Sequence, residues 1–262
     1  MNIGFFDSGL GGLIVLKAVA AAMPEYDFSF YGDTANLPYG DKTEEEIYEM
    51  TKEGMAHLFE GGSVLVIIAC NTASAETLRR LQDEFLPAEY PDGRILGVII
   101  PTIEEAVVLS KSDVLLLATK RTVVSGKYDI EFNKKGGQGI NLTSVATPEL
   151  VPFIELGEID AAVRAAVKKI DLAAGESEVV ILGCTHYTQL KDKLREHYGD
   201  KKIFLSQDEI IPDKLKSYLD NHSEIESRIS STGKRGVHLS KHRPDYDQLM
   251  SQFLGGVFMP AE

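Results

Sequence analysis

The feature that most constrains this chain is a repeated alternation of short apolar runs with segments whose apolar residues recur at helical spacing. Val64–Ala69 is an uninterrupted apolar run of strand length, and Leu78, Leu81 and Phe85 then mark one helix face. Strands that alternate with helices are typical of parallel sheets, so the sequence predicts an α/β fold with largely parallel sheets. The predicted strands are Ile3–Phe6, Phe28–Tyr31, Val64–Ala69, Arg94–Ile100, Val114–Ala118 and Val179–Leu182.

Two segments of the chain echo each other. Val66–Thr72 and Val180–His186 both run from an apolar strand through a small residue to a cysteine and two polar residues. The cysteines are Cys70 and Cys184, so the offset is 184 − 70 = 114. Ligands of open parallel sheets bind at the carboxyl ends of the strands, where both cysteines fall. The echo predicts two similar α/β domains with largely parallel sheets that face each other across an active-site cleft.

Composition excludes several classes of protein. Lys and Arg number 27 against 40 Asp and Glu, a net charge of −13, which is unsuited to general binding of nucleic acid or an anionic membrane. Two cysteines are too few for a disulfide framework or a four-thiolate zinc site. The longest apolar run, Val64–Cys70, is far shorter than the ~20 residues of a membrane helix. The first residues lack the basic region of a secretory signal, so we expect a cytoplasmic protein with reduced thiols.

A cysteine at a strand end, just before a helix, lies near backbone N–H groups, which should lower its pKa below about 8.5. Two such thiols on opposite walls suggest a base on one face of a carbon centre and an acid on the other. The alternative is that each cysteine is a small apolar residue that packs well at a strand end.

Asp7 could accept a proton near Cys70, and His186 could tune Cys184 or bind substrate. Hydroxyl, amide and backbone donors could hold carboxylates, the side chains being Ser8, Asn71, Thr72 and Thr185.

Four blocks of sequence carry a family resemblance: Gly4–Leu13, Gly32–Gly40, Ala69–Ala75 and Gly183–Tyr187. Weaker blocks are Gly97–Pro101 and Leu150–Glu155. In this order they resemble the cofactor-independent aspartate/glutamate racemase superfamily, above all its glutamate branch, over most of residues 1–210. The resemblance implies an isomerase that interconverts L- and D-glutamate without cofactor or metal. It also implies a homodimer that supplies D-glutamate for peptidoglycan.

The resemblance assigns a role to each matching position. Cys70 corresponds to the base for the D-enantiomer and Cys184 to the base for the L-enantiomer. Asp7, His186 and Glu155 correspond to assisting polar groups, although Glu149 competes with Glu155 for that role. The substrate-binding positions are Asp7, Ser8, Tyr39, Gly40, Asn71, Thr72, Thr119, Thr122, Thr185 and His186. The implied domains are residues 1–99 with 209–262, and residues 100–208.

The sequence also departs from the family pattern. Ala118-Thr119 stands where Gly-Thr is expected, and Ser206-Gln207 stands where Ser-Gly is expected. After residue 220 only Ser231-Thr232-Gly233 fits, and we interpret the locally basic stretch Arg228–Arg243 as solvated surface. Within it, His238 and His242 read as a surface pair rather than a metal site.

Two other functions stay open at this point. One is an aspartate racemase or a broader amino-acid racemase, because a pocket distinguishes one methylene by only about 1–3 kcal/mol. The other is a dicarboxylate-binding protein without catalysis. No dinucleotide fingerprint supports a cofactor enzyme, because after Gly9-Leu10-Gly11-Gly12 the place of the last fingerprint glycine is occupied by Ile14.

Overall fold

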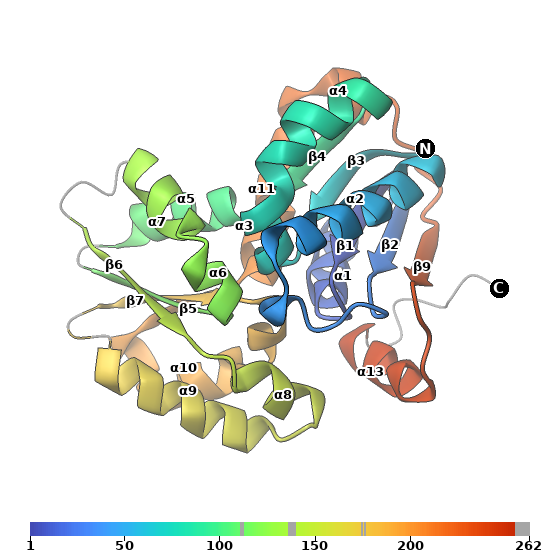
Figure 1. Ribbon diagram of the computed structural model, residues 1–262. Coiled ribbons are helices and arrows are strands. Elements are labelled where there is room, and N and C mark those ends of the chain that lie inside the picture. Colours follow the sequence, from blue (N-terminus) through green and yellow to red (C-terminus); the bar gives the residue numbers. More distant parts are fainter. Residues whose placement is uncertain (111–112, 136–139, 174, 176, 255–262) are drawn as a thin grey trace.

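The strands form two separate sheets in the computed structural model, which describes residues 1–110, 113–135, 140–173, 175 and 177–254 (Figure 1). The first sheet contains β1 (Asn2–Asp7), β2 (Phe28–Gly32), β3 (Ser63–Ile68), β4 (Arg94–Gly97) and β9 (Arg235–Leu239), in the order β4-β3-β1-β2-β9. The second contains β5 (Val114–Ala118), β6 (Leu142–Ala146), β7 (Val179–Gly183) and β8 (Ile203–Leu205), in the order β6-β5-β7-β8. Every pairing is parallel, so the predicted fold class is confirmed.

Each sheet carries helices on both faces and is called a lobe below. The first lobe includes α1 (Gly12–Ala22), η1 (Tyr39–Asp41), α2 (Glu44–Glu60), α3 (Asn71–Arg80), the π-helical η2 (Leu81–Phe85), α4 (Leu86–Glu89), α11 (Gln207–Asn221), α12 (Ser223–Glu226) and α13 (Pro244–Leu254). The second lobe includes α5 (Ile99–Leu109), α6 (Lys120–Val124), α7 (Lys127–Lys134), α8 (Leu150–Glu155), α9 (Ile159–Ala173), η3 (Thr185–Leu190), α10 (Lys191–Tyr198) and η4 (Gly199–Lys201). In the part of the chain that the structure describes, no helix is both long and apolar enough to cross a bilayer.

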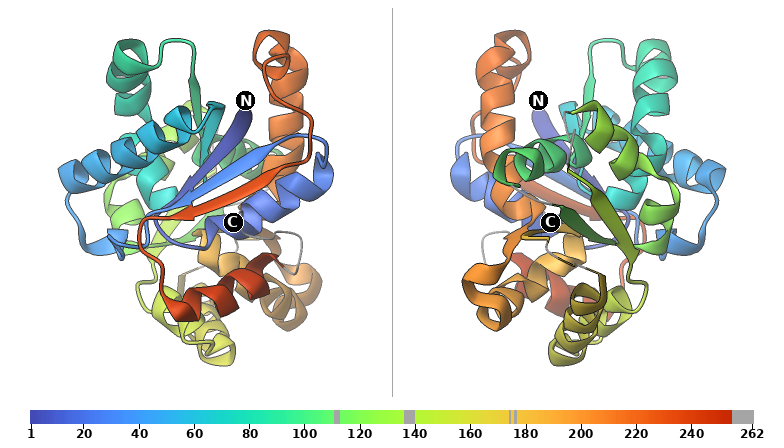
Figure 2. Two further views of the ribbon diagram at one scale, coloured as in Figure 1. Left: turned by 90° about the vertical axis from the view of Figure 1, so that its right-hand side faces the viewer. Right: turned by 90° about the vertical axis from the view of Figure 1, so that its left-hand side faces the viewer.

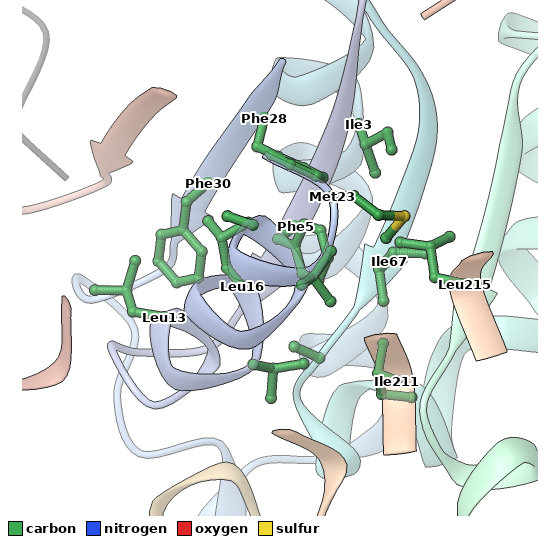
Figure 3. Packing of buried hydrophobic residues seen from close by; sticks show 14 of the residues in the cluster. Ile3, Phe5, Leu13, Leu16, Met23, Phe28, Phe30, Ile67, Ile211 and Leu215 are labelled. Carbon is green, nitrogen blue, oxygen red and sulfur yellow. The ribbon is translucent and has the colours of Figure 1, made fainter. Parts of the chain in front are cut away.

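Neighbouring phenylalanines on β1 show why the first sheet needs helices on both faces. Phe5 packs with α1, α11 and α13, whereas Phe6 packs on the other side with α2 and α3. Figure 3 shows Phe5 among Leu16 of α1 and Leu215 of α11. A strand with both faces buried reads as a continuous apolar run, which is why these strands were visible in the sequence.

The second sheet is buried in the same way. Leu115 and Leu117 of β5 face α8, α9 and α10, while Val114 and Leu116 face α5 and α7. After β8 the chain returns to the first lobe, where α11 packs against α1. Beyond α11, β9 adds to the edge of the first sheet beside β2 (Figure 2).

A capping box is present at the start of α2. The Thr43 side chain accepts from the Glu46 N–H at 3.3 Å, and the Glu46 carboxylate accepts from the Thr43 N–H at 2.8 Å. Both contacts satisfy backbone donors that the first helical turn leaves unpaired.

The prediction of one long strand over Arg94–Ile100 is wrong. Strand β4 ends at Gly97, and α5 begins at Ile99. Pro101 lies in the first turn of that helix, where proline is accepted because its missing N–H would have no partner.

The interpretation of Arg228–Arg243 as solvated surface holds for most of its residues, which are exposed or partly exposed, but it misses a strand. Within it, β9 pairs with β2 in the register Phe28 to Arg235. The segment before β9 is held by Asp27, whose carboxylate accepts from the Thr232 hydroxyl at 2.9 Å and from the Lys234 N–H at 2.9 Å. An edge strand is only half covered, so its sequence lacks the apolar run that marks a central strand.

Candidate active site

The two cysteines occupy equivalent places in the two lobes. Cys70 follows β3 and is the N-cap residue of α3, and Cys184 follows β7 and precedes η3. Both are free thiols and each is only 7% exposed. The predicted position at the carboxyl ends of parallel strands is therefore confirmed for both.

The lobes touch beside these cysteines. The Thr185 hydroxyl of the second lobe donates to Asp7 Oδ2 of the first at 3.2 Å. A Cβ added to Gly11 would lie 2.4 Å from Thr185 Oγ1 and 2.9 Å from His186 Nδ1. Gly11 has φ −59° and ψ −33°, ordinary for any residue, so glycine is needed here for space.

Cys70 sits in a buried and weakly polar environment. Its Sγ lies 3.3 Å from Ser8 Oγ and accepts from the Ala73 N–H at 3.4 Å. Burial, and then the charge of Asp7, raise the pKa of Cys70 to about 12, although the Ala73 and Ser8 contacts lower it. The expectation of a depressed pKa at the start of the helix is wrong for this thiol, because desolvation outweighs two donors.

Asp7 ends β1 and is 1% exposed. Its Oδ1 accepts from the Gly9 N–H at 2.8 Å, in addition to the Thr185 contact. Burial raises the pKa of Asp7, and the His186 charge and these hydrogen bonds oppose it. Asp7 is therefore a carboxyl that can hold a proton between the two lobes.

Cys184 has a different neighbour. His186 Nδ1 lies 3.8 Å from the Cys184 sulfur, and His186 Nε2 lies 3.3 Å from Glu155 Oε1. Burial lowers the pKa of His186, but Cys184 and Glu155 together raise it well above its usual value. The imidazole is thus held in its cationic form beside the thiol.

The structure separates the two candidate glutamates. Glu155 ends α8 and contacts His186, whereas Glu149 lies 3.6 Å from the ammonium of Lys169. Only Glu155 joins the group around Cys184.

Three threonine hydroxyls meet where α3 of the first lobe approaches α6 of the second. Thr72 Oγ1 lies 2.9 Å from Thr119 Oγ1 and 3.1 Å from Thr122 Oγ1, and the last two are 2.9 Å apart. Thr119 caps α6 by accepting from the Thr122 N–H at 3.2 Å. The structure brings together all three residues that the sequence proposed.

The remaining predicted positions reveal two residues that sequence reasoning missed. The buried Tyr39 donates to Asp33 Oδ2 at 2.7 Å, and Asn71 Oδ1 accepts from the Tyr128 hydroxyl at 2.6 Å. A Cβ on Gly40 would meet nothing within 4 Å. Asp33 lies within Gly32–Gly40, one of the blocks that carry the family resemblance, so the sequence did contain a signal for it. Tyr128 had none, because its contact joins different lobes.

The histidines of the C-terminal segment do not act together. His238 is exposed, and the centroid of its ring lies 4.1 Å from that of the His57 ring. His242 Nε2 instead contacts Asp247 Oδ1 at 2.8 Å. Among the described residues, no group of three or more His, Cys, Asp or Glu side chains could hold a metal ion.

The geometry defines a class: a two-lobed parallel α/β protein with one buried thiol from each lobe at the junction. The sequence matches the family described as Asp/Glu/hydantoin racemase over residues 15–211. A glutamate racemase of Roseobacter denitrificans is 37% identical over 236 residues, which covers 85% of this chain and 86% of the relative. A glutamate racemase of Phenylobacterium zucineum is 37% identical over 292 aligned residues and covers 100% of both chains.

Solved structures agree on the fold. A glutamate racemase from Campylobacter jejuni superposes with a TM-score of 0.81 at 28% identity, covering 99% of this chain and 100% of the other. One from Francisella tularensis, in complex with D-glutamate, has a TM-score of 0.87 at 24% identity and covers 100% and 96%. This chain belongs to the Asp/Glu/hydantoin racemase family and is an isomerase, an amino-acid racemase.

Proposed function

We propose that this enzyme interconverts L- and D-glutamate by 1,1-proton transfer between Cys70 and Cys184. One observation carries the proposal: two free, buried thiols follow equivalent strands of two lobes, and the lobes touch beside them. The glutamate substrate is supported by relatives of that activity that align with most or all of the chain.

In the D-to-L direction, the Cys70 thiolate takes the proton from the α-carbon and becomes a thiol. The electron pair left on that carbon spreads into the α-carboxylate. The Cys184 thiol then gives its proton to the opposite face and becomes a thiolate. The reverse reaction exchanges the two roles, so each turnover leaves the thiols in the state that the opposite direction requires.

The α-hydrogen of an amino acid is a very weak acid, so the site must stabilise the carbanion. Backbone N–H groups at the start of α3 and the Thr72, Thr119 and Thr122 hydroxyls are fixed donors that need no reorganisation when charge develops. Both thiols are buried, which strengthens every such interaction by excluding water.

Different neighbours favour the thiolate form of each cysteine. Asp7 accepts or returns a proton near Cys70, and the ammonium of a bound amino acid favours the Cys70 thiolate that burial disfavours. On the other side, the His186 cation favours the Cys184 thiolate, and Glu155 holds His186 in that form. Asp7, His186 and Glu155 are therefore the proposed assisting groups.

The proposed substrate contacts come from both lobes. Each offers a hydrogen-bond donor, or in the case of glycine a backbone without a side chain, at a strand end or helix start, where anions bind well. They are Asp7, Ser8, Tyr39, Gly40, Asn71, Thr72, Thr119, Thr122, Thr185 and His186.

We further propose that residues 1–99 with 209–262, and residues 100–208, are two domains. In support, α5 packs with the core of the second sheet, and α11 packs against α1 of the first lobe. A homodimer, a cytoplasmic location and the supply of D-glutamate to peptidoglycan synthesis complete the proposal, and these rest on family membership.

Racemisation of glutamate is tested by circular dichroism of purified protein with L-glutamate and, in parallel, L-aspartate. We expect optical rotation to vanish for glutamate with a larger kcat/KM than for aspartate. A larger value for aspartate would make the enzyme an aspartate racemase. Binding without loss of rotation for either amino acid would leave a dicarboxylate-binding protein.

A further inference from the structure

Tyr128 makes a contact across the lobes that has no place in the reaction scheme above. It lies on α7 of the second lobe and is 1% exposed. Its hydroxyl donates to Asn71 Oδ1 at 2.6 Å. Asn71 is the first residue of α3 in the first lobe and directly follows Cys70. The phenol therefore touches the side chain that is next in sequence to one proposed base.

The Tyr128 hydroxyl is the donor in this hydrogen bond. Burial, and the charge of Cys184, raise the pKa of Tyr128 far above its usual value, so the phenol keeps its proton and can donate it. A carboxamide that accepts a hydrogen bond on its oxygen must present its NH2 group in the other direction. Tyr128 thereby selects one of the two orientations of the Asn71 amide.

The other end of that amide is unsatisfied. Asn71 Nδ2 is buried and has no hydrogen-bond partner among the described residues, and the residue as a whole is 2% exposed. Buried donors nearly always have an acceptor, because leaving one unpaired is costly. The adjacent residues are Cys70 and Thr72, both proposed to face the substrate, so a ligand is well placed to supply that acceptor.

We propose that Tyr128 is a positioning residue: its hydroxyl holds the Asn71 amide so that Nδ2 is offered to the α-carboxylate of the substrate. This inference rests on the proposed racemase function. The α-carboxylate gains negative charge when the α-carbon loses its proton, so a fixed donor there binds the transition state more strongly than the substrate. Because the phenol and the amide come from different lobes, the amide is oriented only while the lobes are together.

The test is a double-mutant cycle on the full-length enzyme with Tyr128→Phe, Asn71→Ala and the double variant. Tyr128→Phe keeps the ring and removes only the hydroxyl, so we expect kcat/KM to fall by about 10-fold, mostly in kcat. Asn71→Ala removes the donor and should lower kcat/KM by about 100-fold. If Tyr128 acts through Asn71, the double variant is no slower than Asn71→Ala, whereas independent effects would multiply to about 1,000-fold.

Tyr198→Phe is the matched control. Tyr198 is also buried in the second lobe, and its hydroxyl donates at 2.8 Å to Asp171 Oδ1, a carboxylate that is not among the proposed site residues. It should lose thermal stability as Tyr128→Phe does and keep its kcat/KM. Asn71→Asp adds a second check, because it keeps the acceptor for Tyr128 and replaces the NH2 group with an oxygen. We expect this variant to be at least as slow as Asn71→Ala.

The outcomes separate the inference from the function on which it rests. If wild-type enzyme racemises neither glutamate nor aspartate, the proposed function fails, and the inference fails with it because no reacting α-carboxylate remains. If wild-type enzyme racemises either one, the cycle is run with that amino acid. Unchanged kcat/KM in folded Tyr128→Phe, or multiplicative losses in the double variant, would then overturn the role of Tyr128 and leave the racemase standing.

Discussion

The two strand–cysteine units share a backbone position and differ in charge. Cys70 caps a regular α-helix by accepting from the Ala73 N–H, whereas Cys184 makes no such cap and is followed by a 3-10 helix. Cys70 is beside Ser8 and feels the negative charge of Asp7. Cys184 is beside the cationic His186, which Glu155 supports. The two lobes thus place their thiols at equivalent backbone positions but surround them with different charged groups.

In the proposed two-base scheme, the two half-reactions therefore use different assistance. Beside Cys184 the protein itself supplies a cationic side chain, His186. The Cys70 thiolate lacks a cationic side chain in the contacts described and depends on the charge that a substrate brings.

The largest effect is expected from removing either thiol. Cys70→Ala and Cys184→Ala should each lower racemisation by about 10³-fold or more, because one proton transfer loses its only partner. The sharper readout is exchange of the α-proton with solvent. Cys70→Ala should still exchange L-glutamate, and Cys184→Ala should still exchange D-glutamate, both without inversion. Near-normal racemisation by either folded variant would refute the two-base scheme.

Gly11→Ala tests the contact between the lobes. The new methyl would lie within 3 Å of Thr185 and His186, so the second lobe must shift. We expect kcat/KM to fall by about 100-fold, the effect of misplacing groups by roughly an ångström. Gly236→Ala is the control, since a Cβ there meets nothing within 4 Å. Equal kinetics of the two variants would show that the contact is unimportant.

His186→Gln tests the cation beside Cys184. Loss of the positive charge removes the electrostatic stabilisation of negative charge on the Cys184 sulfur, so proton transfer to and from that sulfur should slow. The two enantiomers have equal free energy, so kcat/KM must fall equally in both directions. Solvent exchange is free of that constraint and should slow more for L-glutamate than for D-glutamate. Equal slowing of both exchanges would show that His186 does not serve Cys184 alone.

The smallest effect is a pH dependence of stability. The pKa of His186 is raised in the folded protein above its ordinary 6.5. Its contribution is therefore fully present below pH 6.5 and is lost as the pH rises through the folded-state pKa. Thermal unfolding of wild type and His186→Gln across that range should show a stability difference that shrinks with increasing pH. A difference that grows with pH would mean that folding lowers this pKa.

Much of the fold was readable from the sequence because most strands are buried on both faces. The strands that were missed are β6, β8 and β9. Every residue of β6 and four of five in β9 are only partly buried, and β8 has three residues, so none forms a long apolar run. All three lie at the ends of their sheets, where covering is incomplete.

Residues of the candidate site could be predicted from the sequence where they follow strands. They could not be predicted where their contacts join the two lobes. Cys70, Cys184 and His186 were predicted from the repeated strand end. The contact of Tyr128 with Asn71 joins residues 57 positions apart and leaves no local pattern. The direction of the Cys70 pKa was also missed, because sequence shows the helix start that lowers it and hides the burial that raises it.

Whether two bases act on opposite faces of the α-carbon is decided by starting the enzyme on fully protiated L-glutamate in D₂O. Mass spectrometry of the separated enantiomers at early times then follows the α-position. Two monoprotic thiols predict that the first D-glutamate carries deuterium while the unconverted L-glutamate keeps its protium. D-glutamate that retains the original proton would mean that a single group serves both faces, and would contradict the two-base scheme.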